Sequence, residues 1–168
     1  HPEIQLLEPE RPEPKTFLRA DAPVNSEQYA ELFGQRIGRV LGEKSTSYLD
    51  RPQSAARIKA ALPDAKIVVI VREPFARAVS HYRFSVQNGA ETLDMAAAFT
   101  PEAEERSYET ARYSVSPFLY LKRGRYADWL QPWVDVFGVS RVHVVVFERL
   151  VAEPGTLARI HRYLGVEE

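Results

Sequence analysis

The chain has 168 residues, of which 45% are hydrophobic and 27% are charged, a composition typical of one globular domain rather than of a disordered chain. Its 22 basic and 23 acidic residues give a net charge of −1, which argues against bulk nucleic-acid binding. The chain contains no cysteine, which excludes disulfides, thiolate zinc sites and a cysteine nucleophile and fits a cytoplasmic protein.

The N-terminal part of the chain is polar and rich in proline. Residues 1–24 are expected to form an extended, irregular segment, and they match neither a signal peptide nor a transit peptide. A short helix is expected over residues 26–37, then a short strand at Val40–Leu41 and a helix over residues 52–61 that begins with proline. No stretch approaches the roughly 18 apolar residues of a transmembrane helix, so no membrane span is expected.

The clearest element is a run of β-branched apolar residues within residues 66–71 (KIVVIV), which predicts a buried strand of a parallel sheet. A second buried strand is expected over residues 142–147. Further helices are expected over residues 74–87, 92–105 and 154–164, with one long helix or a broken pair over residues 117–137 that places Trp129 and Trp133 in the core. This alternation predicts an α/β fold, with helices flanking a parallel sheet, in a single domain spanning residues 1–168.

The strongest functional signal follows the first buried strand, in the segment KIVVIVREPFARAVSHY. Arg72 lies at the carboxyl end of the strand, where parallel sheets bind ligands, and Ser80 lies on the next helix. A guanidinium, a hydroxyl and nearby helix N-terminal amides can form an anion pocket. The alternative is that Arg72 pairs with Glu73, Glu43 or Glu148 and that Ser80 only packs. His81 is more typical of a packed histidine than of a catalyst.

Two further segments carry candidate functional residues. In GEKSTSYL, Glu43 can act as a general base and Lys44 can hold an anionic group, although a surface ion pair with a hydroxyl helix cap is the alternative. In LKRGRYADWLQPW, a basic cluster of Lys122, Arg123 and Arg125 surrounds a glycine. Such a cluster is usually a solvated face, but it can also contact an anionic substrate.

Together these segments resemble the PAPS-dependent sulfotransferase family, in particular its heparan-sulfate-type and bacterial members, where PAPS is 3′-phosphoadenosine 5′-phosphosulfate. The resemblance covers most of the chain in the family's order and is most specific over residues 62–82. The supporting segments are residues 11–18, 42–49, 121–138 and 142–166, with the helix that contains Arg57.

The resemblance implies a P-loop-like α/β sheet and transfer of a sulfuryl group from PAPS to a hydroxyl or amine, with 3′,5′-adenosine bisphosphate as product. By this resemblance, Arg72 and Ser80 match positions that bind the 3′-phosphate of the nucleotide. Glu43 matches the catalytic base, and Lys44 lies where a lysine often approaches the acceptor or the sulfate. A carbohydrate acceptor is expected first, contacted by His81 and the basic cluster, while a lipid, a polyketide or another small-molecule alcohol stays open.

Two features of the family are not found in the sequence. The family holds the 5′-phosphosulfate in an N-terminal glycine-rich loop, whereas the first glycine here is Gly34, and Lys15 alone cannot replace a loop of amides. The family also covers the nucleotide with a basic loop, which would begin near Glu168.

We therefore expect an incomplete sheet, in either a fragment of a longer enzyme or a degenerate member of the family. The alternative function is a non-catalytic α/β binding module. A P-loop kinase is disfavoured because the sequence contains no G-x-x-x-x-G-K-[ST] motif. No metal site is expected, since His1 and His161 are far in sequence from other ligand types.

Overall fold

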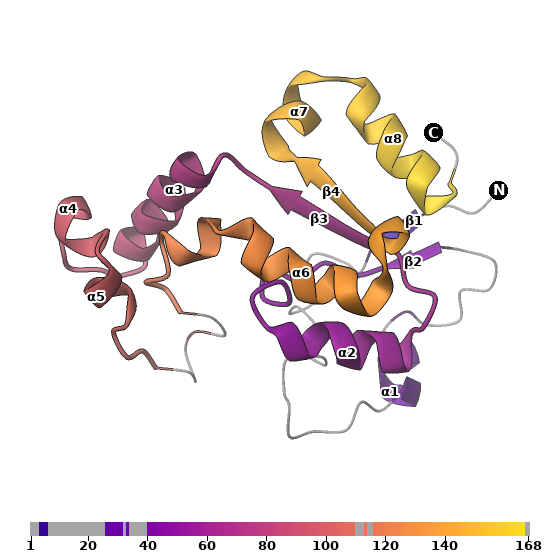
Figure 1. Cartoon of the computed structure of the whole chain (residues 1–168), viewed down its shortest axis with the longest axis horizontal. Helices are drawn as coiled ribbons and strands as arrows, with labels where there is room; N and C mark the ends of the chain where they lie inside the picture. Colours follow the sequence, from indigo (N-terminus) through magenta and orange to yellow (C-terminus); the bar gives the residue numbers. More distant parts are fainter. Residues whose placement is uncertain are drawn as a thin grey trace.

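The computed structural model describes residues 4–6, 26–31, 33, 40–109, 113 and 116–166, and the strands among them form parallel pairs. Strand β1 (Ile4–Leu6) pairs with β2 (Val40–Gly42), and β3 (Ile67–Val71) pairs with β4 (Val142–Val146). Helices pack around these two small sheets, as Figure 1 shows. The α/β class and the parallel pairing predicted from the sequence are confirmed.

The helices alternate with the strands along the chain. The α-helices are α1 (Ser26–Glu31), α2 (Pro52–Ala61), α3 (Pro74–Gln87), α4 (Met95–Ala98), α5 (Pro101–Glu104), α6 (Tyr126–Phe137), α7 (Phe147–Ala152) and α8 (Gly155–Leu164), and the 3₁₀ helices are η1 (Lys122–Gly124) and η2 (Val139–Arg141). Among the described residues, no helix is both long and apolar enough to cross a membrane.

Elements with strong local signals have the predicted bounds. Helices α2 and α3 begin at a proline and end where expected, because proline fits the first turn of a helix, where its missing N–H group is not needed. Helix α8 ends at Gly165, whose φ of 80° lies in the left-handed region that a glycine reaches without strain. Local chemistry therefore fixes the helix that carries Ser80.

Three predictions of single elements are wrong, and a fourth, the broken pair over residues 117–137, has narrower bounds than predicted. Residues 92–105 form two short helices rather than one, because Thr100 caps α5 and Pro101 opens it. Residues 117–121 are not helical, so the broken pair is the 3₁₀ helix η1 followed by α6. Strand β4 ends at Val146, and an unpredicted helix, α7, follows it directly. Within the proline-rich start, Ile4–Leu6 is a strand rather than irregular chain, and most of residues 1–24 lies outside the described residues.

One core lies between α2, α6 and the β3–β4 pair. Its buried members are Tyr48, Ala55, Ile58, Trp133, Phe137 and Val142. The rings of Trp133 and Phe137 stack with centroids 6.2 Å apart, one turn apart on α6. Trp129 is half-buried and donates from Nε1 to the carbonyl of Lys122, so only one of the two tryptophans belongs to this core. Burial of these rings holds α6, and with it η1, beside the sheet.

The second core lies under α3 and surrounds a buried carboxylate. Tyr120, Phe118, Ala78 and Ala98 pack together there, at the end of the molecule where Figure 1 places α3, α4 and α5. The side chain of Glu91 is fully buried and accepts hydrogen bonds from both terminal nitrogens of Arg106 and from the hydroxyl of Tyr120. These bonds satisfy a charge that would otherwise be costly to bury.

Glu91→Gln should lower the free energy of unfolding by about 3 kcal/mol, because it leaves the Arg106 guanidinium without its charged partner. Burial alone would raise the pKa of Glu91, but hydrogen bonds from Arg106, from the Leu93 N–H and from Tyr120 lower it to about 2. A lowered pKa stabilises the fold above pH 4.5, and this contribution is lost as the pH falls toward 2. Urea unfolding at pH 7 and pH 3 measures both effects. The exposed Glu102→Gln in α5 is the control and should change neither value by more than about 0.5 kcal/mol.

Candidate functional site

The end of β3 is anchored by a tyrosine from a distant part of the chain. The hydroxyl of Tyr126 donates to the carbonyl of Arg72 at 2.8 Å and lies 3.3 Å from the backbone N–H of Arg72. Both backbone groups of Arg72 therefore have a partner immediately beyond the strand ladder. This contact fixes the backbone from which the Arg72 side chain extends.

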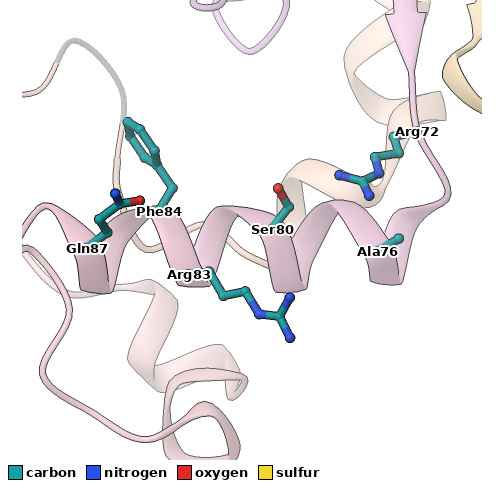
Figure 2. A pocket seen from close by; sticks show the side chains of 6 residues that line it. All are labelled: Arg72, Ala76, Ser80, Arg83, Phe84 and Gln87. Atoms are coloured by element: carbon teal, nitrogen blue, oxygen red, sulfur yellow. The ribbon is translucent and has the colours of Figure 1, made fainter.

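An open hollow of about 430 Å³ begins at Arg72 and follows one face of α3 (Figure 2). Its lining residues are Arg72, Ala76, Ser80, Arg83, Phe84 and Gln87. In Figure 2 the Ser80 hydroxyl and the Arg72 guanidinium lie on the same side of α3. The structure thus brings together the two residues that the sequence predicts as an anion pocket.

Three residues of the hollow are missed by the sequence analysis: Arg83, Phe84 and Gln87. None of these three residues is assigned a role from the sequence alone. All three follow Ser80 at spacings of three, four and seven residues, which places them on the same helical face. That periodicity was the signal that could have found them.

The Arg72 side chain forms an ion pair and is also partly exposed to solvent. Its Nε lies 3.8 Å from Oε1 of Glu148, and its guanidinium lies 5.6 Å from the ring centre of Phe147. The pairing of Arg72 with Glu148 is part of the alternative predicted from the sequence, but Ser80 is exposed on the lining of the hollow and does not only pack. However, 41% of the Arg72 side chain is exposed, and an ion pair this long in solvent contributes little. An incoming anion can compete with Glu148 for the guanidinium.

The N-terminal amides of α3 do not belong to the anion pocket, contrary to the prediction. The carboxylate of Glu73 accepts hydrogen bonds from the N–H groups of Phe75 at 3.0 Å and Ala76 at 2.6 Å. These bonds lower the pKa of Glu73. Since a side chain of the same helix already occupies these donors, anion binding must rely on side chains.

His81 packs inward, beside the hollow rather than on its lining. Its ring meets the ring of Tyr120 edge to face, with centroids 4.9 Å apart. Burial lowers the pKa of His81 to about 3, and the charges of Arg123 and Arg77 act in the same direction. His81 is therefore neutral at physiological pH and has the surroundings of a packed histidine.

Glu43 and Lys44 follow β2 in a turn of hydroxyl residues. Glu43 is half-buried and Lys44 is exposed. Burial, and after it the charge and hydrogen bond of Glu43, raise the pKa of Tyr29, so this carboxylate lies beside the phenol. The amide of Ser47 donates to the hydroxyl of Ser45 at 3.2 Å, which stabilises the turn. A half-buried carboxylate at a strand end fits the chemistry of a general base.

The three residues of the basic cluster lie in different environments. Arg123 is largely buried and pairs with a carboxylate at 3.1 Å. Lys122 lies 3.8 Å from Glu105, and Arg125 lies 2.9 Å from Asp128, both at the surface. Each of the three cations has an acidic partner. Among the described residues, no group of three or more metal-ligating side chains could hold a metal ion.

Known proteins with similar sequences identify the family of this chain. Residues 4–168 match the model of a family described as the sulfotransferase family. The chain is 33% identical over 141 residues to mouse heparan sulfate glucosamine 3-O-sulfotransferase 3B1, which covers 83% of this chain and 35% of the relative. It is 28% identical over 140 residues to a bifunctional heparan sulfate N-deacetylase/N-sulfotransferase 1 from Caenorhabditis briggsae, covering 77% of this chain and 16% of the relative. The chain thus spans about a third or less of these curated relatives.

A solved structure extends the agreement to the fold. A sulfotransferase from Alicyclobacillus acidocaldarius superposes with a TM-score of 0.78 at 31% identity, covering 99% of this chain and 72% of that one. A sulfotransferase domain from the curacin biosynthetic pathway, at 20% identity and a TM-score of 0.57, shares the fold over 85% of this chain and 44% of that one. The chain belongs to the sulfotransferase family.

Proposed function

We propose that this chain forms the nucleotide- and acceptor-binding part of an enzyme that transfers a sulfuryl group from PAPS to a hydroxyl or amine of a carbohydrate. The observation that carries the proposal is the hollow at the end of β3, which is lined by the partly exposed side chain of Arg72 and by the exposed Ser80. Membership of the sulfotransferase family gives this anion site its expected ligand.

The residues present fit the 3′-phosphate of the donor. A guanidinium presents a planar fork of N–H donors to phosphate oxygens, and the Ser80 hydroxyl can donate a further hydrogen bond from the same side of α3. Ala76, one turn before Ser80 on α3, also lines the hollow and has a small side chain that adds little bulk to it. The donor supplies a sulfuryl group attached to a good leaving group, and this chain's residues bind and orient it.

Glu43 is the proposed general base. As the acceptor oxygen or nitrogen forms its bond to sulfur, the bond from sulfur to the bridging phosphate oxygen breaks, and the acceptor proton passes to the Glu43 carboxylate. Lys44, next to it and exposed, is placed to offset negative charge on the sulfuryl group or the acceptor. A carbohydrate acceptor is supported by the relatives whose names specify heparan sulfate.

Calorimetric titration with 3′,5′-adenosine bisphosphate, with ATP as the control, tests the proposal. Both nucleotides carry an adenine and 5′-phosphate, but only the first carries a 3′-phosphate. Binding that is selective for the bisphosphate supports the proposed site. Equal binding of both nucleotides, or none, contradicts the assignment of the hollow to the 3′-phosphate in this chain.

A further inference from the structure

Residues 120–126 form a segment that contacts two separate parts of the site, and we call it the bridge segment. Toward α3, the guanidinium of Arg77 donates to the carbonyl of Tyr120. Gly124 lies so close to the start of α3 that a Cβ at this position would be 3.3 Å from Cβ of Pro74. These contacts hold the bridge segment against the helix that carries Ser80.

Two further contacts hold the bridge segment close to the end of β3 and to α5. The Tyr126 hydroxyl binds both backbone groups of Arg72, as described above. The buried carboxylate of Glu104 accepts hydrogen bonds from the N–H groups of Leu121 and Lys122. The position of the bridge segment relative to the anion hollow is therefore fixed by the backbone contacts at both of its ends.

The side chain of Arg123 connects the bridge segment to the other part of the site, the turn after β2. Nε of Arg123 lies 3.1 Å from Oδ2 of Asp50, and Nη2 of Arg123 donates to the carbonyl of Thr46 at 3.2 Å. The Arg123 and Asp50 side chains are 20% and 7% exposed. Thr46 and Asp50 belong to the turn that follows β2, residues 43–50, which also contains Glu43.

We propose that Arg123 is a positioning residue, which fixes the turn of residues 43–50, with its candidate base Glu43, relative to the anion hollow on α3. The purpose of this positioning rests on the proposed function, but the contacts of Arg123 do not depend on that function. Arg123 acts through Asp50 and Thr46 and does not contact the transferred group. The role differs from the contact with an anionic substrate that the sequence suggested for Arg123.

The chemistry of the pair favours a positioning role over ligand binding. The guanidinium of Arg123 already has a carboxylate and a carbonyl as partners. Within the described part of the chain, the side chains of Lys122 and Arg125 pair with exposed carboxylates, at 3.8 and 2.9 Å. Burial raises the pKa of Asp50, and the charge of Arg123 opposes that rise. Loss of Arg123 would leave a largely buried carboxylate without its nearest cation.

The absence of native cysteine allows a direct test in the whole chain. Spin labels at Lys44→Cys, in the turn, and Val86→Cys, on α3, report the distance between the two parts; both positions are exposed. The parent pair should give one narrow distance peak. Arg123→Ala should lose that peak and give a broad distribution, Arg123→Lys should recover part of it, and the surface variant Arg125→Ala should keep it.

The affinity of the Arg123 variants for 3′,5′-adenosine bisphosphate shows whether Arg123 positions the turn or binds the nucleotide. Arg123→Ala should keep the affinity of the unsubstituted chain, because Tyr126 and Gly124 still hold the hollow. A narrow peak in Arg123→Ala would overturn the proposal, and so would a loss of affinity as large as that of Arg72→Ala, which would make Arg123 a ligand. If the unsubstituted chain binds no bisphosphate, the proposed function fails while the distance measurement still decides the role of Arg123.

Discussion

Arg72→Ala is expected to reduce the affinity for 3′,5′-adenosine bisphosphate by about 100-fold or more, since two charge-assisted hydrogen bonds contribute about 1.5–3 kcal/mol each. The fold should survive this change. The end of β3 is held through the backbone of Arg72 by the Tyr126 hydroxyl, and truncation of the side chain leaves that contact in place. The side chain itself gives up a long, exposed pair with Glu148 and its contact with the ring of Phe147.

Calorimetry measures the affinity, and circular dichroism with thermal unfolding verifies the fold. Arg149→Ala is the matched control, because it removes the same charge from an exposed site on α7 that lies outside the hollow. Its affinity should stay within about twofold of the parent chain, because an exposed charge at a distance is screened by salt. Unchanged affinity in Arg72→Ala, or an equal loss in Arg149→Ala, would remove Arg72 from the nucleotide site.

Glu43→Gln should slow sulfuryl transfer by about 10²–10⁴-fold and leave nucleotide affinity unchanged. The amide has nearly the shape of the carboxylate but cannot accept the acceptor proton. Transfer of labelled sulfate by the intact enzyme at saturating donor measures the turnover, and titration measures the affinity. The exposed Glu31→Gln in α1 is the control for removal of one negative charge.

Two results would contradict the assignment of Glu43. Turnover equal to that of the unsubstituted enzyme would exclude Glu43 as the base. A parallel loss of nucleotide affinity would indicate that the change disturbs the turn, because Glu43 also contacts the phenol of Tyr29. Tyr29→Phe keeps the carboxylate and removes that contact, so it separates the two causes.

The parts of the fold that were predictable are those with local signals. Proline at a first helical turn and asparagine–glycine after a last turn bracket α3, and a run of β-branched residues marks β3. Because Arg72 and Ser80 belong to one strand and the helix directly after it, their convergence also follows from local structure. For this reason the sequence alone predicts that Arg72 and Ser80 lie together, and both line the hollow.

The rest depends on contacts between distant segments. Nothing near Arg123 in the sequence indicates that its partner is Asp50. The sequence also does not show that the Glu73 side chain caps α3 and so occupies the amides that were predicted to bind an anion. The break between α4 and α5 depends on one threonine and one proline, against a helical periodicity that runs through both. These features depend on contacts between distant residues and on single capping residues, which the periodicity of the sequence does not reveal.

The pairing of β3 with β4 also has a consequence for the order of folding. Ile67 pairs with Val142, which lies 75 positions later in the chain (142 − 67), and closing so long a loop is entropically costly and slow. Arg72 and Ser80 lie within one strand–helix unit inside that loop and need no such closure to come together. We expect α3 and its row of side chains to become ordered early, and the strand pair that anchors Arg72 to close in the slowest phase of refolding.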